Sequence, residues 1–418
     1  MTKIHDFVII GAGISGLYTA YILTKYFNKD VVVIEKENRI GGRIYTIKYD
    51  KDLTLELGAG VISASHNNLL KLIKHLGLSD KLIHGAKKSR NYYDKETNKL
   101  ISLNDSGFYK ILNDINSKIT DNDHHYSLYH LIEKYYDNKT AKLITDQFGY
   151  SDDILHRNAV NALEMFNKNG EFNPDNHYIF LTGGFNQIID KLADKLNVMT
   201  GVECTNITKE DDHYICELSR VHLFQMRTKN IICAIPVQNL LRIPFFRSSY
   251  DMYNSVLVNK PLMRVYLQFQ IDINKKLWFE DMDGSFITNT IIRQMIPINK
   301  KTGLIMVYVD GIDAVGLHIL DNNEILESEI MLNIRKLFPD KVIDHPIKFY
   351  KKYWEIGTHL WKTNPNHQLT NKLMHPIDHE NVYVVGEGVN SKHNWIEGAI
   401  MSVHDCIRKM NKCFTASQ

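Results

Sequence analysis

One glycine-rich stretch near the beginning of the chain constrains its fold more than any other feature: FVIIGAGISGLYTAYILTKYFNKDVVVIEKENRIGGR, residues 7–43. An apolar run leads into three spaced glycines and an amphipathic stretch, and a second β-branched run ends on the acid Glu35. This order predicts a strand, a tight turn, a helix and a second strand. Gly11 allows the turn, Gly13 allows a pyrophosphate to approach the backbone, and Gly16 allows the helix to pack against the strand. The stretch therefore predicts a dinucleotide-binding unit.

The predicted unit offers contacts to phosphates and to a ribose. The N-terminus of the helix presents unpaired N–H groups and the positive end of a dipole to the phosphates. Glu35 lies 19 positions after Gly16, where its carboxylate can accept hydrogen bonds from ribose hydroxyls. A tight turn without a ligand is the alternative, but the accompanying strand, helix and acid favour binding. The predicted contacts are Gly11, Gly13, Ile14, Ser15, Gly16, Glu35 and Lys36.

The segment after Glu35 distinguishes between dinucleotides. Gly41, Gly42 and Arg43 form a GGR sequence, and an arginine fork suits a diphosphate because it donates two hydrogen bonds at once. At this point the sequence resembles the flavin-dependent amine oxidase family, which includes monoamine and polyamine oxidases. In that family a GGR segment follows the ribose-binding acid and wraps the diphosphate of FAD. The resemblance implies FAD as the cofactor.

Weaker motifs extend the resemblance along the chain. A strand pattern ending in Gly58, Ala59 and Gly60 resembles the family's segment beside the flavin ring, where small residues allow close approach. Val202 matches a valine whose backbone contacts the adenine in the family. Near the end of the chain, a buried strand pattern runs into a "GE" pair, and an "EGA" sequence starts a helix that faces the flavin in the family. The implied contacts in this last block are Gly386, Glu387, Trp395, Ile396 and Ala399.

The resemblance implies an α/β fold in which an FAD-binding, Rossmann-like domain of the glutathione reductase type is interleaved with an α+β substrate domain. A length of 418 residues agrees with two domains. We expect residues 1–80, 178–248 and 365–418 to form the FAD-binding domain. Residues 81–177, a helical insertion, and 249–364, a mixed sheet with helices, should form the substrate domain.

Four local patterns give further expectations. Residues 83–175 lose strand character, and residues 68–78 and 324–337 have the spacing of amphipathic helices. Residues 264–269 and 306–309 alternate as half-buried strands do. His124, His125 and His130 lack companions at a spacing suited to metal ligands, so we expect no metal site.

Composition narrows the partners and the compartment. With 50 basic and 48 acidic residues the chain shows no nucleic-acid footprint. No apolar stretch approaches the roughly 20 residues that a membrane span needs, and the last residues are polar, so we expect a soluble protein without an anchor. The five cysteines show no CxxC spacing, which favours reduced thiols in the cytoplasm. A monomer and a homodimer both stay open.

The family's reaction places few demands on acid–base groups. The resemblance implies hydride transfer from the α-carbon of an amine to flavin N5, hydrolysis of the imine, and reoxidation by molecular oxygen to give hydrogen peroxide. The family usually has a lysine near N5 on a strand of the substrate domain. Arg264 matches that position, and Lys260, four residues earlier, is the alternative. Because Pro261 follows Lys260, we expect Lys260 to lie outside regular strand.

Two aromatic walls in the family orient the amine. Trp395 matches one wall, and His359 is the best match for the other. Packing side chains without a substrate role are the alternative for both. Some members attach flavin to a cysteine near this second wall, but residues 356–361 contain none, so FAD should be non-covalent.

Three functions stay open on the sequence. The first is an amine oxidase that acts on a monoamine, a polyamine or an amino acid. The second is an FAD-dependent dehydrogenase or desaturase of a non-amine, resembling porphyrinogen oxidases, which Arg264 favours because the family lysine is missing. The third is an FAD-bound protein without amine oxidase activity.

Overall fold

The computed structural model of the protein describes residues 3–50, 53–85, 90–94, 97, 99–271, 276–320, 322–363 and 372–416. The chain forms a mixed α/β structure that divides into two compact units. Unit 1 comprises residues 1–83, 179–258 and 365–418, and unit 2 comprises residues 84–178 and 259–364. Each unit is described by itself.

The main sheet of unit 1 is built around its first strand. In the described residues this seven-stranded sheet has the order β10-β2-β1-β13-β12-β11, and β19 also pairs with β13. The pairs β10–β2, β2–β1, β1–β13 and β13–β19 are parallel, whereas β13–β12 and β12–β11 are antiparallel. The bounds are β1 Ile4–Ile10, β2 Val31–Glu35, β10 Asn197–Thr200, β11 Glu203–Glu210, β12 His213–Ser219, β13 Leu223–Cys233 and β19 Val382–Val384.

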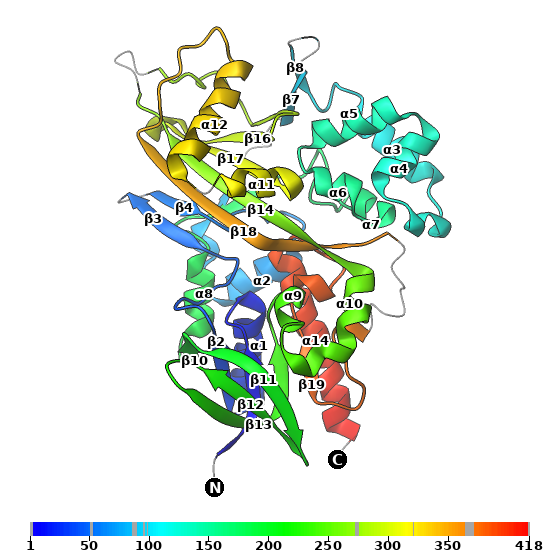
Figure 1. Ribbon diagram of the computed structural model, residues 1–418, viewed down its shortest axis with the longest axis vertical. Coiled ribbons are helices and arrows are strands. Elements are labelled where there is room, and N and C mark those ends of the chain that lie inside the picture. Colours follow the sequence, from blue (N-terminus) through cyan, green and yellow to red (C-terminus); the bar gives the residue numbers. More distant parts are fainter. Residues whose placement is uncertain are drawn as a thin grey trace. The chain divides into compact units, whose positions relative to one another are not determined.

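The first strand and helix of unit 1 follow from their sequences. The second half of β1, Phe7 to Ile10, is buried and apolar, as expected for a parallel strand covered on both faces. Helix α1 (Ile14–Phe27) buries Leu17, Ala20 and Leu23 along one face. The same apolar core contains residues of α14 (Ile396–Ala416), and Figure 1 shows α1 and α14 beside the strands.

Smaller elements complete unit 1. The short strands are β3 Thr46–Asp50, β4 Leu53–Glu56, β5 Ile62–Ser63, β6 Leu82–His84 and β9 Tyr178–Leu181. The α-helices are α2 Asn67–His75, α8 Asn186–Ala193, α9 Val237–Leu240 and α10 Tyr250–Val256. Short 3₁₀ turns are η1 Ser79–Lys81, η3 Pro244–Ser249 and η5 Glu387–Val389.

Unit 2 contains a second sheet, which is mixed. In the described residues it has seven strands in the order β18-β14-β17-β16-β15-β7-β8. The pair β15–β7 is parallel, and β14–β17, β17–β16, β16–β15 and β7–β8 are antiparallel. The bounds are β7 Arg90–Asp94, β8 Lys99–Ser102, β14 Leu257–Gln268, β15 Ser285–Ile287, β16 Gln294–Asn299, β17 Leu304–Asp310 and β18 Lys348–Trp361.

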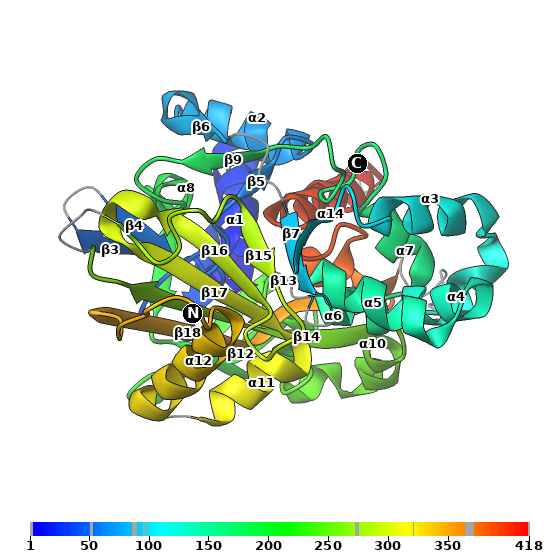
Figure 2. The same cartoon turned by 90° about the horizontal axis from the view of Figure 1, so that it is seen from above.

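The helices of unit 2 form two groups. Helices α11 (Gly311–Ile319) and α12 (Asn323–Leu337) share an apolar core with the sheet. The other helices gather in one group (Figure 2) around their own core, which includes Phe108, Leu131 and Phe148. This second group, residues 108–164, is called the helical segment. Its elements are α3 Phe108–Lys118, η2 Asp121–His125, α4 Leu128–Tyr135, α5 Asn138–Phe148, α6 Ser151–Leu155 and α7 Ala159–Glu164, and the turn η4 Lys300–Thr302 lies in the sheet part.

Most of the local predictions are confirmed, and two are wrong. The predicted helix at 324–337 is α12, the strands at 264–269 and 306–309 lie in β14 and β17, and the sheet is mixed. Residues 83–175 do not lose strand character throughout, because residues 90–94 and 99–102 form β7 and β8. The helix predicted to reach residue 78 ends at His75.

Candidate functional site

The glycine-rich loop after β1 is tightly packed at two of its glycines and open at the third. Gly11 has φ +105°, and a β-carbon there would lie 2.7 Å from the carbonyl oxygen of Ala234. A β-carbon at Gly16 would lie 2.0 Å from the carbonyl oxygen of Gly11, so only glycine lets α1 approach the strand. At Gly13, by contrast, no other part of the described chain comes within 4 Å of a β-carbon, its own neighbours in sequence aside. The loop is therefore tightly packed against neighbouring backbone at Gly11 and Gly16, whereas Gly13 has free space beside it.

The N-terminus of α1 lies at this opening. Gly13 is the N-cap residue, and neither a side-chain cap nor an acidic residue in the first turn neutralises the helix end. The backbone N–H groups of Ile14, Ser15 and Gly16 belong to this first turn. Uncapped N–H groups and the positive end of the helix dipole suit an anion, phosphate above all.

The GGR segment lies against the same loop. The N–H of Gly41 donates to the carbonyl of Ala12 at 2.8 Å, and Gly13 and Gly41 form a parallel bridge. Gly42 has φ +57°, and a β-carbon there would lie 3.3 Å from Cα of Gly13. Two segments about thirty positions apart in sequence therefore line one opening. Arg43 directly follows Gly42 at this opening.

Glu35 ends β2 with both carboxylate oxygens engaged by backbone. One oxygen accepts from the N–H of Ala12 at 2.8 Å and the other from the N–H of Glu37 at 2.9 Å. Each carboxylate oxygen has two lone pairs, so further hydrogen bonds from hydroxyl groups are possible. The side chain of Lys36, the next residue, is exposed. Glu35 thus also stabilises the glycine loop, a role that sequence reasoning missed.

Val202 follows β10 beside the end of β2. It is buried, and its N–H donates to the carbonyl of Glu35 at 2.9 Å. Because that N–H is engaged, an adenine contact through the Val202 backbone would rest on its carbonyl oxygen.

Arg43 joins three segments of unit 1. Its guanidinium Nη1 lies 2.7 Å from Oε1 of Glu387, which is buried. Its carbonyl accepts from the N–H of Ala59 at 3.0 Å, which places the loop of Gly58, Ala59 and Gly60 beside the GGR segment. Gly386, just before Glu387, has φ +145°, and a β-carbon there would meet none of the described residues within 4 Å apart from its neighbours in sequence. Residues predicted from three separate motifs therefore lie together.

Trp395 directly precedes α14, which begins at Ile396 as predicted and contains Ala399 in its first turn. Its ring is half-buried and packs edge-on against His66, with ring centroids 4.8 Å apart. His66 is buried, and its Nδ1 lies 3.2 Å from the N–H of Ser63. The sequence offered only a histidine six residues after Gly60 as a signal for this contact.

Glu397 lies in the EGA motif that is expected to face the flavin, but its side chain caps another helix. Its carboxylate accepts from the N–H of Asn68 at 3.0 Å and from the N–H of Leu69 at 2.9 Å. These donors belong to the first turn of α2, so a residue from α14 caps another helix. The capping fixes α14, and with it Trp395, relative to the loop that carries His66.

In unit 2, Arg264 lies on β14 opposite Tyr308 of β17. Its guanidinium carbon is 4.8 Å from the centroid of the Tyr308 ring, and the side chain is half-buried. Tyr150 packs edge-on against Tyr308 with centroids 5.6 Å apart. Burial raises the pKa of the Tyr150 hydroxyl far above its ordinary value, so this ring stays neutral. The permanent charge of the Arg264 guanidinium therefore lies over the ring of Tyr308.

Lys260 occupies a different environment on the same strand. Pro261 does not interrupt β14, so the expectation that Lys260 lies outside regular strand is wrong. Lys260 is buried, and its Nζ pairs with Asp153 at 2.5 Å and lies 3.6 Å from Asp310. Burial disfavours its charge, but the two carboxylates outweigh this effect and raise the pKa of Lys260. A fully charged, paired lysine is a poor base.

His359 lies near the end of β18 in unit 2 and is buried, whereas Trp395 belongs to unit 1. The hydroxyl of the neighbouring Thr358 donates to the carbonyl of His359 at 3.4 Å. The two predicted walls are therefore contributed by separate units.

Four cysteines have described side chains, and all four are free and buried in unit 1: Cys204, Cys216, Cys233 and Cys406. A hydrogen bond with Cys204 and burial raise the pKa of the Cys216 thiol well above its ordinary value, and burial does the same for Cys233. Burial raises the pKa of Cys406 to about 12. These three thiols are therefore poor nucleophiles. The side chain of Cys413 lies outside the described residues.

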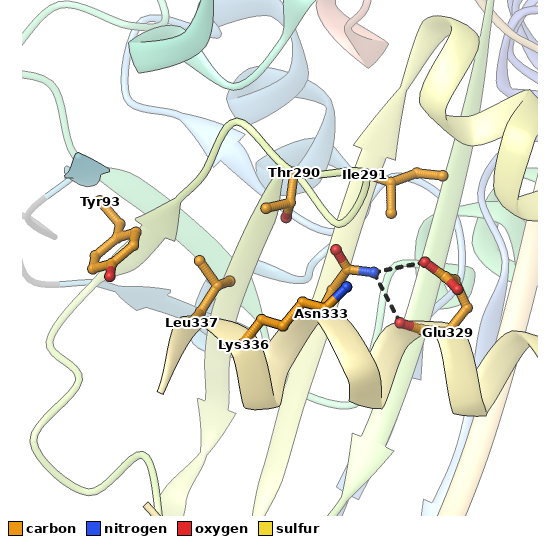
Figure 3. Close-up of a pocket in the computed structure, with 7 residues that line it drawn as sticks. All are labelled: Tyr93, Thr290, Ile291, Glu329, Asn333, Lys336 and Leu337. Atoms are coloured by element: carbon orange, nitrogen blue, oxygen red, sulfur yellow. Dashed lines mark hydrogen bonds between the residues drawn. The ribbon is translucent and has the colours of Figure 1, made fainter. Parts of the chain in front are cut away.

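A pocket of about 380 Å³ lies in unit 2 between α12, β7 and the loop before β16. Figure 3 shows the side chains that line it: Tyr93, Thr290, Ile291, Glu329, Asn333, Lys336 and Leu337. Asn333 Nδ2 donates to the carbonyl and to the carboxylate of Glu329 at 2.9 and 2.8 Å. None of the predicted cofactor or substrate residues lines this pocket.

Comparison with known proteins identifies the family. The family model for flavin-containing amine oxidoreductases matches residues 14–404, nearly the whole chain. The chain therefore belongs to the flavin-containing amine oxidoreductase family, and its cofactor is FAD. Among the described residues, no helix combines the length and the hydropathy needed to cross a membrane.

Individual relatives are amine oxidases of moderate similarity. Amine oxidase [flavin-containing] B of Canis lupus familiaris is 26% identical over 289 residues, which are 62% of this chain and 55% of the relative. The human B enzyme is 32% identical over 130 residues, 28% of this chain and 25% of the relative. Amine oxidase [flavin-containing] A of the dog is 40% identical over 73 residues, 18% and 14% of the two chains. The chain thus matches about half, or less, of the length of these relatives.

Proposed function

We propose that the protein is an FAD-dependent amine oxidase that holds FAD non-covalently in a Rossmann-like domain of the glutathione reductase type. The observation that carries this proposal is the convergence of three motifs in unit 1: Gly13 lies against Gly42 of the GGR segment, and Arg43 of that segment pairs with Glu387. In this proposal unit 1 is the FAD-binding domain and unit 2 is the substrate domain.

The residues of unit 1 are suited to an elongated anionic cofactor. The uncapped N-terminus of α1 is assigned to the diphosphate, and Glu35 to the ribose hydroxyls. Arg43 stays charged in proteins and adds a cation at the diphosphate. Gly58, Ala59 and Gly60 present small residues to the flat ring. Gly386, Glu387 and the start of α14 complete the ring site, because the positive end of a helix dipole stabilises negative charge nearby.

FAD bound there would supply the redox chemistry, namely hydride abstraction from the α-carbon of the amine and transfer of the electrons to oxygen, which would give hydrogen peroxide. The chain's own contribution is to bind, orient and desolvate the substrate. We assign Trp395 and His359 to the walls that orient the amine, which reacts in its neutral form. His66, which packs edge-on against Trp395, supports the first of these walls.

Arg264 is assigned to the position where relatives of this family have a lysine near the flavin. Its charge is permanent and it rests on Tyr308, so it cannot remove a proton from the substrate. It can attract an oxygen anion and stabilise negative charge in a dry site. Lys260 is assigned a structural role because it pairs with Asp153 and Asp310.

The amine oxidase proposal is tested with the purified, FAD-loaded protein and a panel of monoamines, polyamines and amino acids. Peroxide formation and oxygen uptake are measured together. We expect at least one amine class to give both signals in equal amounts. Peroxide from no member of the panel would count against an amine substrate.

Arg264 also supports a second candidate, a dehydrogenase or desaturase of a non-amine, because the lysine usual in the oxidases is replaced. Anaerobic incubation with a porphyrinogen separates the two. Loss of the yellow flavin absorbance with the porphyrinogen, and not with any amine, would favour the second candidate.

A further inference from the structure

Unit 2 contains a group of buried and partly buried charges from both of its parts, the helical segment and the sheet part, which is the sheet with α11 and α12. Asp146, Asp152, Asp153 and Arg157 come from the helical segment or the turn after α6, and Lys260, Arg293, Asp310 and Asp313 come from the sheet part. We call these eight residues the charged joint. Five carboxylates face three cations, so the joint has a surplus of negative charge when every member is ionised.

Two clusters of ion pairs cross the joint. Asp153 pairs with Arg157 at 2.8 Å and with Lys260 at 2.5 Å, which links α6 to β14. Arg293 pairs with Asp313 at 2.7 Å and with Asp146 at 3.2 Å, which links the loop before β16 to α11 and α5. The contact between the helical segment and the sheet part therefore depends on balanced charge at these points.

Asp310 is the member of the joint whose negative charge, when ionised, is poorly compensated by its neighbours. It is fully buried, with 0% of its surface exposed. Within the described part of the chain, no hydrogen-bond donor reaches either of its carboxylate oxygens, and Lys260 Nζ is 3.6 Å away. Asp310 is the N-cap residue of α11, but its side chain does not cap that helix. A buried, ionised carboxylate without hydrogen bonds is strongly unfavourable.

A second carboxylate lies close to Asp310. Gly311 has φ +60°, and a β-carbon there would lie 2.3 Å from Oδ1 of Asp152. The carboxylate of Asp152 therefore packs on the backbone next to Asp310. Glycine is required at position 311 both by the positive φ and by this contact. The proximity of the two acids disfavours ionisation of both at once.

The surrounding groups set the protonation of Asp310. Burial raises its pKa to about 7, Lys260 and Arg293 oppose this, and Asp152 and Asp153 add to it. Burial likewise raises the pKa of Asp152, which also faces His156 at 3.8 Å. The remaining members of the joint are Asp146, Arg157 and Asp313, and the titratable rings beside it are Tyr150 and Tyr308.

We propose that Asp310 carries a proton while the helical segment is docked, and that loss of this proton to water releases the helical segment from the sheet part. In the docked form Asp310 is neutral. Its protonation removes one negative charge from a joint in which five carboxylates face three cations. In the opened form the carboxylate reaches water and ionises at its ordinary value. Docking is thereby linked to pH, independently of the proposed reaction.

The direction of the linkage follows from the raised pKa of Asp310. The docked form binds more protons than the opened form between the ordinary value of 3.8 and about 7. Docking is therefore fully favoured below this window and weakens as pH rises through it. Where Asp310 alone titrates, the opening equilibrium constant should rise about tenfold per pH unit, and it should level off above about pH 7, where Asp310 ionises in the docked form as well.

The proposal is tested by hydrogen exchange on the full-length, FAD-loaded protein at pH 5, 6, 7 and 8, with rates corrected for the intrinsic effect of pH. Peptides from α4 and α5 report on the helical segment, and peptides from α12 serve as the internal reference. We expect the corrected exchange of α4 and α5 to rise about tenfold per unit up to pH 7 and then to level off, whereas α12 changes little.

Three variants sharpen the test. Asp310→Asn cannot ionise at position 310, so its corrected exchange should rise less steeply with pH than that of the parent; the rise that remains comes from Asp152, whose pKa burial also raises. Asp152→Asn removes a neighbouring carboxylate and should move the levelling point to lower pH. Asp281→Asn is the matched control, because Asp281 is exposed and pairs with Lys341 at 3.7 Å on the surface of unit 2, and it should behave as the parent does.

Each outcome bears on the proposal. A parent profile without the rise below pH 7, or an Asp310→Asn profile with the same rise, overturns it. If Asp310→Asn does not fold, the parent and Asp152→Asn decide: a levelling point that does not move removes Asp310 and Asp152 from the linkage. Loss of amine oxidation in any variant is not a readout here, so failure of the proposed function leaves the test intact.

Discussion

Arg43 and Glu387 form an ion pair at 2.7 Å although 344 positions separate them in the chain. The pair fastens the segment after β2 to the turn after β19, and both segments carry predicted FAD contacts. Glu387 is buried, whereas Arg43 is partly exposed. The guanidinium therefore serves two anions in our proposal: the carboxylate of the protein and the diphosphate of the cofactor.

We expect Arg43→Met to lower both the stability of the FAD-free protein and its affinity for FAD. Removing the guanidinium leaves the buried carboxylate of Glu387 without its cation, at a cost of about 1–3 kcal/mol. Urea unfolding measures the first effect and fluorescence titration with FAD the second. Glu387→Gln in the same background should restore part of the stability but none of the affinity.

Lys3→Met is the matched control for Arg43→Met, because Lys3 forms an exposed ion pair with Asp30 at 3.0 Å in the same unit. Such a pair contributes about 0–1 kcal/mol, so both measurements should stay near the parent values. Equal FAD affinity in the parent and Arg43→Met would remove Arg43 from the cofactor site.

Glu35→Gln should weaken FAD binding through two effects. The neutral amide is a weaker acceptor for ribose hydroxyls than a carboxylate is. In addition, one oxygen becomes an NH₂ group that faces the N–H of Ala12 or of Glu37, both of which donate to Glu35 in the parent. We expect a loss of about 1.5–3 kcal/mol in binding, roughly ten- to a hundredfold in Kd, measured by titration.

Glu37→Gln is the control for Glu35→Gln, since its side chain is exposed two residues along the same loop. It should bind FAD as tightly as the parent does, and neither variant should gain affinity for NAD or NADP. The assignment of Glu35 fails if Glu35→Gln and Glu37→Gln bind FAD equally well.

Local sequence patterns predicted the elements that carry the cofactor site. Elements β1, α1 and β2 were predictable because their periods, glycines and terminal acid are contained within some thirty residues. The start of α14 near Ile396 was expected from the resemblance of the EGA sequence to the family. Strand β7 was not, because its sequence RNYYD lacks alternation and its pairing with β15 joins residues far apart in the chain.

Side-chain partners that are far apart in the chain could not be predicted from local sequence patterns. The capping of α2 by Glu397 and the contact of His66 with Trp395 both join the two ends of unit 1. The environment of Lys260 depends on acids supplied by α6 and β17, so no local pattern distinguishes a free lysine from a paired one. Arg264 and Lys260 differ in surroundings although only four positions separate them.

Acid or heat should release intact FAD into the supernatant. The cysteines with raised pKa, Cys216, Cys233 and Cys406, are buried, so their thiolate forms are scarce at neutral pH. Precipitation with trichloroacetic acid, followed by absorbance of the supernatant and of the redissolved pellet, measures the distribution. Flavin that stays with the pellet would contradict the assignment of non-covalent FAD.

Arg264→Met tests the proposed position of Arg264 beside the flavin. The substitution removes a permanent charge and keeps much of the side-chain length, so the recovery of flavin absorbance on mixing with oxygen should slow about tenfold or more. Anaerobic bleaching by a true substrate should change less, because the walls that orient the amine are elsewhere. Arg264→Lys restores the charge and should restore the oxygen reaction. Lys301→Met, which removes an exposed cation from the same unit, is the control and should match the parent. Stopped-flow absorbance of the two half-reactions at saturating FAD decides the matter: equal oxygen reactions in the parent and Arg264→Met would place Arg264 away from the flavin and leave it as a packing partner of Tyr308.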